Sequence, residues 1–155
     1  HIKKYNPLAT VIHARSPLTV DKPALLKNKR AIVVEDGPTL THGGMPYGAG
    51  MLAAQQYGAR VVDVEPYAVG SLKDVYLKFS HLKRVLPAMG YSPEQMKELE
   101  QTINKTPADV VIDGSPFDMK RMLSITKPLV NVTYTLSESG KITLTTVLKN
   151  FLKTV

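Results

Sequence analysis

Short apolar runs alternate along this chain with segments that have a helical pattern, and this alternation limits the folds that the chain can adopt. The apolar runs are aliphatic or β-branched and are bounded by glycine or proline, as is typical of strands covered on both faces. Since the links are short, we predict an α/β, Rossmann-like fold with a mostly parallel open sheet of about five or six strands and helices on both faces. The predicted strands are residues 9–13, 31–35, 60–64, 85–89, 109–113 and 129–135, and the predicted helices are residues 47–57, 72–82, 93–104, 117–125 and 142–152.

The last predicted strand, residues 129–135, differs from the others because it alternates apolar and polar side chains. This pattern predicts an edge strand with one face in contact with water. The chain has 155 residues and contains neither an internal repeat nor a long linker. Residues 1–155 are therefore predicted to form a single α/β domain.

Composition excludes several kinds of site. The chain has no cysteine, which excludes disulfides and thiolate metal sites. No apolar run approaches the roughly 20 residues that cross a membrane, and residues 1–5 lack the apolar core of a secretory signal, so we expect a cytoplasmic protein without a membrane partner. The net charge of +7 is best explained by solvated lysines on the surface, and next best by an anionic small ligand. Nucleic acid is the least favoured partner, because basic and aromatic residues are not interleaved.

A glycine-rich stretch from Glu35 to Gly50 follows the predicted strand at residues 31–35 and leads into the predicted helix at residues 47–57. Such a loop brings free backbone N–H groups and the positive end of a helix dipole close to an anion. The stretch therefore predicts a phosphate-binding cradle, with the alternative that its glycines only supply positive φ angles in a tight loop. The cradle residues are Gly43, Gly44, Gly48 and Gly50, with Tyr47 either binding the ligand through its hydroxyl or packing.

Three side chains of this stretch are candidates for catalysis. Glu35 and Asp36 either coordinate Mg²⁺, because carboxylate oxygens suit that ion, or are strand-end acids satisfied by loop N–H groups. His42 lies beside two glycines, and it either donates to a phosphate and acts as a general acid–base or is structural or merely exposed.

Two further loops follow predicted strands, at residues 65–71 and 113–118. Ligands bind beyond the carboxyl ends of the strands of an open parallel sheet, so we expect the three loops to meet at one edge. The candidate ligand-binding residues on these two loops are Tyr67, Gly70, Ser71, Asp113 and Ser115, and the alternative for Asp113 with Ser115 is ordinary turn chemistry.

Five ordered motifs join these loops into one signature. The first loop reads EDGPTLTHGGM with YGAG at residues 35–50, the second reads PYAVGS at residues 66–71, and the third reads DGSPFD at residues 113–118. LPAMGY at residues 86–91 and TIN at residues 102–104 complete the set. Over residues 16–135 the chain resembles the cyclic 2,3-diphosphoglycerate synthetase family. Members of that family tend to read Gly-Thr-Pro-Ile-Asp where this chain has DGSPFD.

This resemblance implies a ligase that closes 2,3-diphosphoglycerate into a cyclic phosphoanhydride while ATP is converted to ADP and phosphate. Many members of the family are described only as GTPases, so the implied cofactors are Mg²⁺ and ATP or GTP. The members are much longer, and their P-loop and Asn-Lys-x-Asp segment lie upstream of the part that is similar here. We therefore expect the C-terminal domain or a fragment of a longer NTPase, which is inactive without the missing N-terminal NTPase domain and is a candidate for homo-oligomerisation.

On the same resemblance, the glycine loop holds the phosphates of a phosphorylated small molecule. His42 then donates to phosphate or transfers a proton, Glu35 and Asp36 bind metal or water, and Asp113 supports the ligand. One alternative is a non-catalytic binding or oligomerisation domain of a GTPase. Another is an α/β domain that binds nucleic acid through its basic surface, which strongly salt-dependent binding would reveal.

Overall fold

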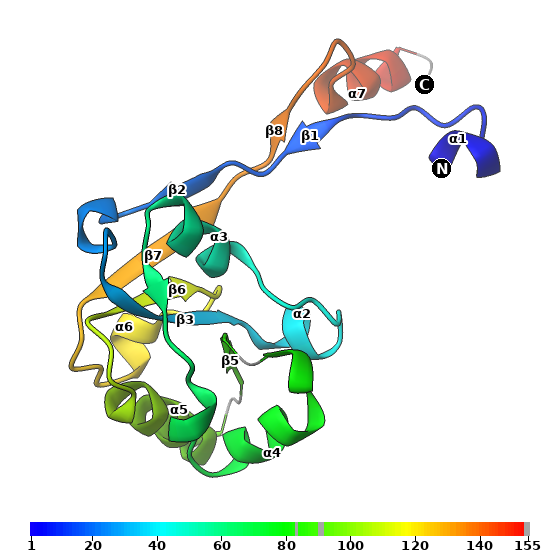
Figure 1. Cartoon of the computed structure of the whole chain (residues 1–155). Coiled ribbons are helices and arrows are strands. Elements are labelled where there is room, and N and C mark those ends of the chain that lie inside the picture. The colour runs from blue at the N-terminus through cyan, green and yellow to red at the C-terminus, as the bar shows by residue number, and fades with distance from the viewer. Residues whose placement is uncertain (83, 90–91, 154–155) are drawn as a thin grey trace. The chain divides into compact units, whose positions relative to one another are not determined.

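The chain forms two compact units in a computed structural model that describes residues 1–82, 84–89 and 92–153. Leu18–Thr133 form the first, here called the sheet unit. His1–Pro17 and Tyr134–Val155 form the second, here called the terminal unit. Figure 1 traces the elements of each unit along the chain.

The central strand of the sheet unit is β3 (Arg30–Asp36), whose residues 31–35 are all buried. An apolar run without alternation fits this place, because a central strand is covered on both faces. On one side β3 pairs in parallel with β6 (Val110–Gly114). On the other side it pairs in parallel with β4 (Arg60–Val61) near its start and with β5 (Leu86–Ala88) near its end.

The sheet continues beyond β6 with β7 (Leu129–Tyr134), which is parallel to β6, and then with β2 (Leu18–Val20). The prediction that residues 129–135 form an edge strand was wrong, because β2 pairs with the far side of β7. The polar side chain of Asn131 on β7 is used in that pairing, since its amide group and its backbone N–H both donate to Asp21.

Helices cover both faces of the sheet around β3 (Figure 1). Helix α3 (Ala49–Gln56) lies on one face, and α4 (Ser71–Lys78) and α5 (Pro93–Lys105) lie on the other. The start of α5 is the one predicted from sequence: Ser92 Oγ accepts from the N–H of Gln95 at 3.2 Å, and Pro93 occupies the first turn. The shorter helices of this unit are α2 (Gly37–Thr41), α6 (Met119–Met122), and three 3-10 segments, η1 (Pro23–Leu25), η2 (Glu65–Tyr67) and η3 (Ser80–Leu82).

The predicted α/β fold with a mostly parallel sheet is confirmed. The predicted strand at residues 9–13 was wrong: these residues form neither helix nor strand. The helix predicted at residues 117–125 is limited to α6: Asp118 caps its start by accepting from the N–H of Arg121, and the extended backbone of Leu123 ends it. Gly90 and Tyr91 of the motif at residues 86–91 lie outside the described residues.

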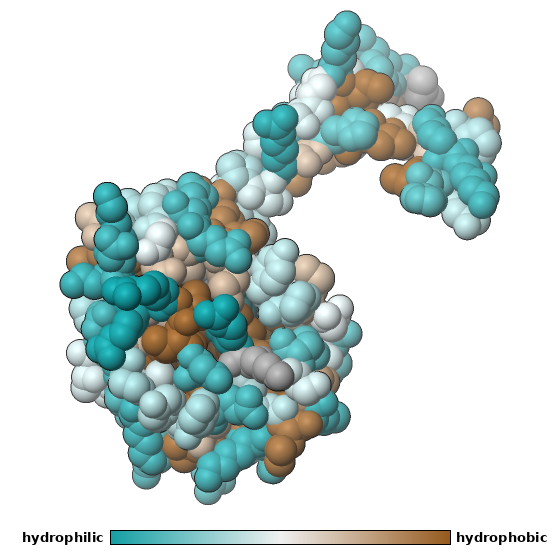
Figure 2. Space-filling view, viewed as in Figure 1, coloured by the Kyte–Doolittle hydropathy of each residue, from teal (hydrophilic) through white to brown (hydrophobic). Residues whose placement is uncertain are grey.

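The terminal unit consists of two short helices, α1 (Ile2–Tyr5) and α7 (Leu144–Leu152), and an antiparallel pair, β1 (Ala14–Arg15) with β8 (Ser137–Glu138). All buried apolar side chains lie in the sheet unit, between Val20 and Val132. In the described part of the terminal unit no residue is buried, and Figure 2 shows apolar side chains at its surface. Over the ranges that the structure describes, no helix is long and apolar enough to span a membrane.

Candidate functional site

Three parallel strands end together at the carboxyl edge of the sheet. Glu35 near the end of β3 is paired with Gly114 of β6 on one side and with Pro87 of β5 on the other. The next residue of β3, Asp36, is paired with Ala88. This edge is where open α/β sheets bind their ligands, and it brings the first and third candidate loops together as predicted.

Glu35 is held by the backbone of its own loop. Its side chain is 1% exposed, Oε1 accepts from the N–H groups of Gly48 and Met51 at 3.0 and 2.8 Å, and Oε2 accepts from that of Gly50 at 3.2 Å. These N–H groups belong to the N-terminus of α3, where a negative charge is favourable. Burial raises the pKa of the Glu35 carboxyl, although the three hydrogen bonds oppose the rise. The structure therefore places an internal carboxylate where the sequence predicted a phosphate.

Glycine is required at two positions around Glu35, because the backbone there lies close to the Glu35 carboxylate. A Cβ on Gly48 or Gly114 would lie 2.5 or 2.6 Å from Oε2 of Glu35. Gly43 and Gly44 lie further along the loop and are exposed, and Gly44 has a φ of +63°. Of the four predicted cradle glycines, these two are the ones that face solvent, as does Tyr47.

Asp36 begins helix α2, which the sequence did not predict. Its Oδ2 accepts from the N–H and the hydroxyl of Thr39 at 3.1 and 2.5 Å, as an N-cap residue does. Oδ1 of Asp36 accepts no hydrogen bond from the described residues. His42 follows the end of α2, is exposed, and has its Nδ1 3.1 Å from the hydroxyl of Thr41. One carboxylate oxygen and one imidazole are thus open to solvent on this loop.

Asp113 and Ser115 form a closed turn at the end of β6. Oδ1 of Asp113 accepts from the N–H of Ser115 at 2.9 Å and from its hydroxyl at 2.7 Å. Burial raises the pKa of the Asp113 carboxyl to about 6 against these hydrogen bonds, and the charge of Asp118 raises it further. The side chain is 4% exposed, so Asp113 supports the loop from inside.

The second candidate loop is held by helix α5. Oε2 of Glu98 on α5 accepts from the N–H and the hydroxyl of Ser71 at 3.0 and 2.5 Å. Thr102 of α5 accepts from the N–H of Val69 at 3.0 Å. Gly70, with a φ of +57°, leaves room for Glu98, and the exposed Tyr67 lies in η2. Here too an internal carboxylate occupies the N-terminus of a helix.

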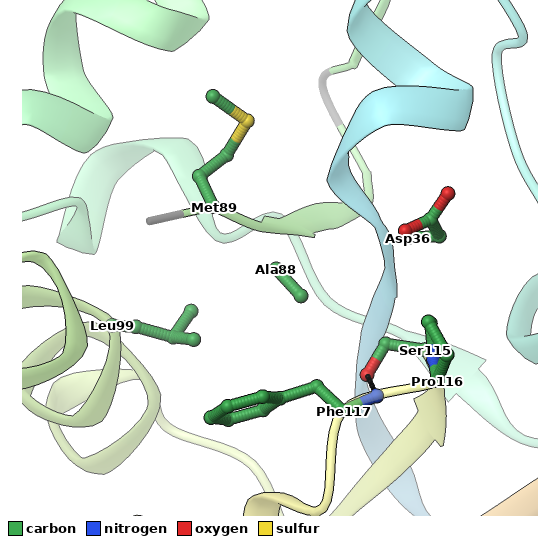
Figure 3. Close-up of a pocket in the computed structure, with 7 residues that line it drawn as sticks. All are labelled: Asp36, Ala88, Met89, Leu99, Ser115, Pro116 and Phe117. Atoms are coloured by element: carbon green, nitrogen blue, oxygen red, sulfur yellow. Dashed lines mark hydrogen bonds between the residues drawn. The ribbon is translucent and has the colours of Figure 1, made fainter. Parts of the chain in front are cut away.

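A cavity of about 200 Å³ opens at the carboxyl edge (Figure 3). Asp36 and Ser115 supply its polar groups, and Phe117 turns its ring toward the side of Leu99, away from Asp36. No lysine, arginine or histidine lies among the described residues that line it. Its lining consists of Asp36, Ala88, Met89, Leu99, Ser115, Pro116 and Phe117.

Of the two carboxylates predicted to bind a metal, Asp36 is the one that keeps an oxygen without a hydrogen bond from the described residues. Within the described part of the chain, no group of three or more His, Cys, Asp or Glu side chains could hold a metal ion. Glu35 uses both oxygens on backbone N–H groups, whereas Asp36 keeps Oδ1 open. Mg²⁺ often binds through one or two carboxylates together with substrate phosphates and water, so Asp36 fits such a shared site and Glu35 does not.

Sequence reasoning missed several residues of this edge. The role of Thr39 could have been predicted, because Asp36 follows a predicted strand and stands three residues before Thr39, as an N-cap residue does at the start of a helix. Phe117 lies in the DGSPFD motif that was singled out in the sequence, although it was not named as a site residue. Glu98 and Leu99 had no signal, since they belong to α5, which approaches this edge only in the folded chain.

Comparison with known proteins gives one informative match. No family model matches the chain, and no solved structure matches it. The chain is 56% identical over 153 residues to arginine synthetase ArcE of Thermococcus kodakarensis. The matched region covers 98% of this chain and 34% of that protein. The chain thus spans about a third of the length of this relative. The resemblance to cyclic 2,3-diphosphoglycerate synthetases is supported only at a coarser level, and what the comparison does show is that this chain is similar to part of a synthetase, an enzyme of the ligase type.

Proposed function

We propose that this chain is the substrate-side part of an NTP-dependent ligase whose product is arginine. The observation that carries the proposal is the 56% identity over 98% of the chain to a protein named arginine synthetase. At such identity the same fold and the same carboxyl edge are expected in both proteins. The nucleotide would be held by residues outside these 155, because the chain has no P-loop.

The charges at the carboxyl edge favour arginine over a phosphorylated substrate. The N-termini of α3 and α4 already face Glu35 and Glu98, so their dipoles are not free for a phosphate. The cavity itself contains a carboxylate and, along its described lining, no basic side chain. A polyanion would meet uncompensated repulsion from Asp36 there, whereas a cationic or neutral nitrogen group would be attracted.

The chemistry of such a ligase defines what the site has to do. A guanidinium group can be made by replacing the oxygen of a ureido group with nitrogen, and the oxygen can leave only after it has been activated by phosphoryl transfer from the NTP. Bound Mg²⁺ would neutralise the phosphate charge during that transfer and so offset its repulsion from Asp36. In this proposal Asp36 orients the nitrogen end of the substrate, the exposed His42 donates a hydrogen bond to the transferred phosphoryl group, and Glu35 keeps the loop in shape.

The proposal is tested on the full-length protein with Mg-ATP or Mg-GTP, an amino acid that carries a ureido group, and ammonium. Arginine is measured by chromatography and phosphate release by a coupled assay. Formation of one arginine per nucleotide consumed supports the proposal. Nucleotide consumption that depends on 2,3-diphosphoglycerate instead, or no arginine with any nucleotide, overturns it.

A further inference from the structure

We propose that the cavity beside Asp36 binds the side chain of the amino-acid substrate, with its nitrogen head group against Oδ1 of Asp36 and its methylene stem along Leu99 and Phe117. This inference rests on the proposed function and adds to it the place and the orientation of the substrate. Three features of the cavity support it: a carboxylate fixed in position, an apolar wall of matching size, and the sign of the surrounding charge.

The carboxylate of Asp36 is fixed before any ligand arrives. Its backbone is paired with Ala88 of β5, and Oδ2 is held by two hydrogen bonds from Thr39. Oδ1 is left to face a ligand. A carboxylate whose orientation is already set loses little entropy when it pairs with a planar guanidinium, which presents N–H donors in a rigid fork.

The apolar wall suits an aliphatic stem. Leu99 is 2% exposed and belongs to the core, so its side chain offers a rigid surface. The half-buried Phe117 turns its ring toward Leu99 (Figure 3). The volume of about 200 Å³ is below the roughly 300–1,000 Å³ of pockets for drug-sized ligands. A single unbranched side chain with a polar end fills a space of this size and shape.

The charges near the cavity select the head group. Ser115, which lines the cavity, is bonded to Asp113, and Asp118 lies on the same loop. Asp36 and the buried Asp113 make the polar end acidic, whereas Asp118 does not line the cavity and is paired with Arg121. A cationic head group gains a charge-assisted hydrogen bond there, while a carboxylate or phosphate is repelled.

A competing role for Asp36, as a magnesium ligand, predicts a different result from its substitution. If Oδ1 bound Mg²⁺, replacing the carboxylate would raise the Mg²⁺ concentration needed for turnover. If Oδ1 binds the substrate head group, the same replacement weakens arginine binding and leaves the magnesium requirement unchanged. The two roles are therefore separable in one variant.

The test measures binding of L-arginine and of L-norleucine to the full-length protein by calorimetry, for the wild type, Asp36→Asn and Asp74→Asn. Asparagine still caps α2, since its side-chain oxygen is as good an acceptor, and Asp36→Ser is a second capping variant in case the first does not fold. We expect both Asp36 variants to bind L-arginine at least tenfold more weakly, because a hydrogen bond to a charged group is lost. Asp74 lies exposed on α4 outside the cavity, so its variant should bind as the wild type does.

L-Norleucine reports on the stem alone. Its weaker binding should be unchanged in Asp36→Asn and reduced, together with that of L-arginine, in Phe117→Ser. Unchanged arginine affinity in Asp36→Asn overturns the inference, and so does a raised magnesium requirement at unchanged arginine affinity. If either of these results is obtained while the wild type makes arginine, only the inference about the cavity fails. If the wild type neither makes nor binds arginine, the proposed function fails as well.

Discussion

The carboxylate of Glu35 does for helix α3 what a bound anion does at other helix N-termini. It accepts from the N–H groups of Gly48, Gly50 and Met51 inside the protein. Removing one partner of a buried hydrogen bond costs more than the bond itself contributes, because the other partner stays desolvated. Glu35 should therefore matter for stability as well as for the shape of the site.

We predict that Glu35→Ala lowers the free energy of unfolding by about 3 kcal/mol or more, since it leaves buried N–H groups without an acceptor. Glu35→Gln should cost about 1–2 kcal/mol, because one oxygen remains to accept while the new NH₂ faces the N–H of Gly50. Urea unfolding of both variants measures the difference. Equal stability of the alanine variant and the wild type would contradict this account of α3.

Asp113 makes stability depend on pH with a defined sign. Its pKa of about 6 in the folded protein lies above the ordinary value of 3.8, so the folded chain keeps a proton that the unfolded chain releases. The contribution of this group is thus fully present below about pH 4 and is lost as the pH rises through 6. Two pKa units correspond to about 3 kcal/mol.

We predict that Asp113→Asn removes this dependence. Relative to the wild type, the variant should gain about 2–3 kcal/mol in the free energy of unfolding between about pH 4 and 7.5. Urea titrations at the two pH values measure the change, with the exposed Asp74→Asn as the control. A constant difference between variant and wild type at both pH values would show that Asp113 titrates normally.

At the scale of elements, α4 and α5 are joined through Gly70. A Cβ at this position would lie 1.8 Å from Oε1 of Glu98, and the φ of +57° strains any other residue. We predict that Gly70→Ala costs about 3 kcal/mol or more, from backbone strain and from the displaced bonds between Glu98 and Ser71. Gly58→Ala is the matched control, because its φ is +71° but nothing lies within 4 Å; it should cost only about 1–2 kcal/mol.

Thermal unfolding of both glycine variants measures this comparison. A similar loss of stability at Gly58 and Gly70 would mean that the contact with Glu98 contributes nothing. A loss at Gly70 that Glu98→Ala partly relieves would identify the steric contact as its source.

The elements that the sequence predicted well are those with a local cause. The run at residues 31–35 became the buried strand β3, and Ser92-Pro93 fixed the start of α5. Residues 9–13 are less apolar, and the antiparallel pairing with β8 only reaches their end, at His13, whose carbonyl accepts from the N–H of Ser139. The alternation in β7 marks a more exposed face, as predicted, since buried and less buried residues alternate along the strand. It does not exclude a further strand, and β2 pairs with β7 on its far side.

The residues of the candidate site also divide into those with a local sequence signal and those that depend on distant contacts. Glu35, Asp36 and Asp113 could be named from sequence because acids and glycines mark strand ends. Their partners could not, since Glu98 and Leu99 approach from a helix far along the chain. Whether an N–H group faces an internal carboxylate or an external phosphate depends on such distant contacts, and the sequence alone left both interpretations of Glu35 open.

At the scale of the whole molecule, burial is confined to one of the two units. No described residue of the terminal unit is buried, whereas the sheet unit contains the apolar core. Segments without buried contacts open at little cost in free energy and are cut first by proteases. The two units should therefore differ sharply in resistance to cleavage.

We predict that mild trypsin digestion of this chain cuts after Arg15 and Lys141, both in the terminal unit, and leaves a resistant fragment of residues 16–141. Mass spectrometry of the digest over time identifies the fragment. Early cleavage after Lys97 or Lys105, which lie in α5, at the same rate as after Arg15 would contradict the difference between the units.

The hydrogen bonds of Glu35 have a consequence for ligand binding at the carboxyl edge. The loop at residues 48–51 is anchored by the protein's own side chain, so its conformation does not wait for a visiting molecule. A ligand that binds at this edge would therefore lose no binding free energy to the ordering of this loop.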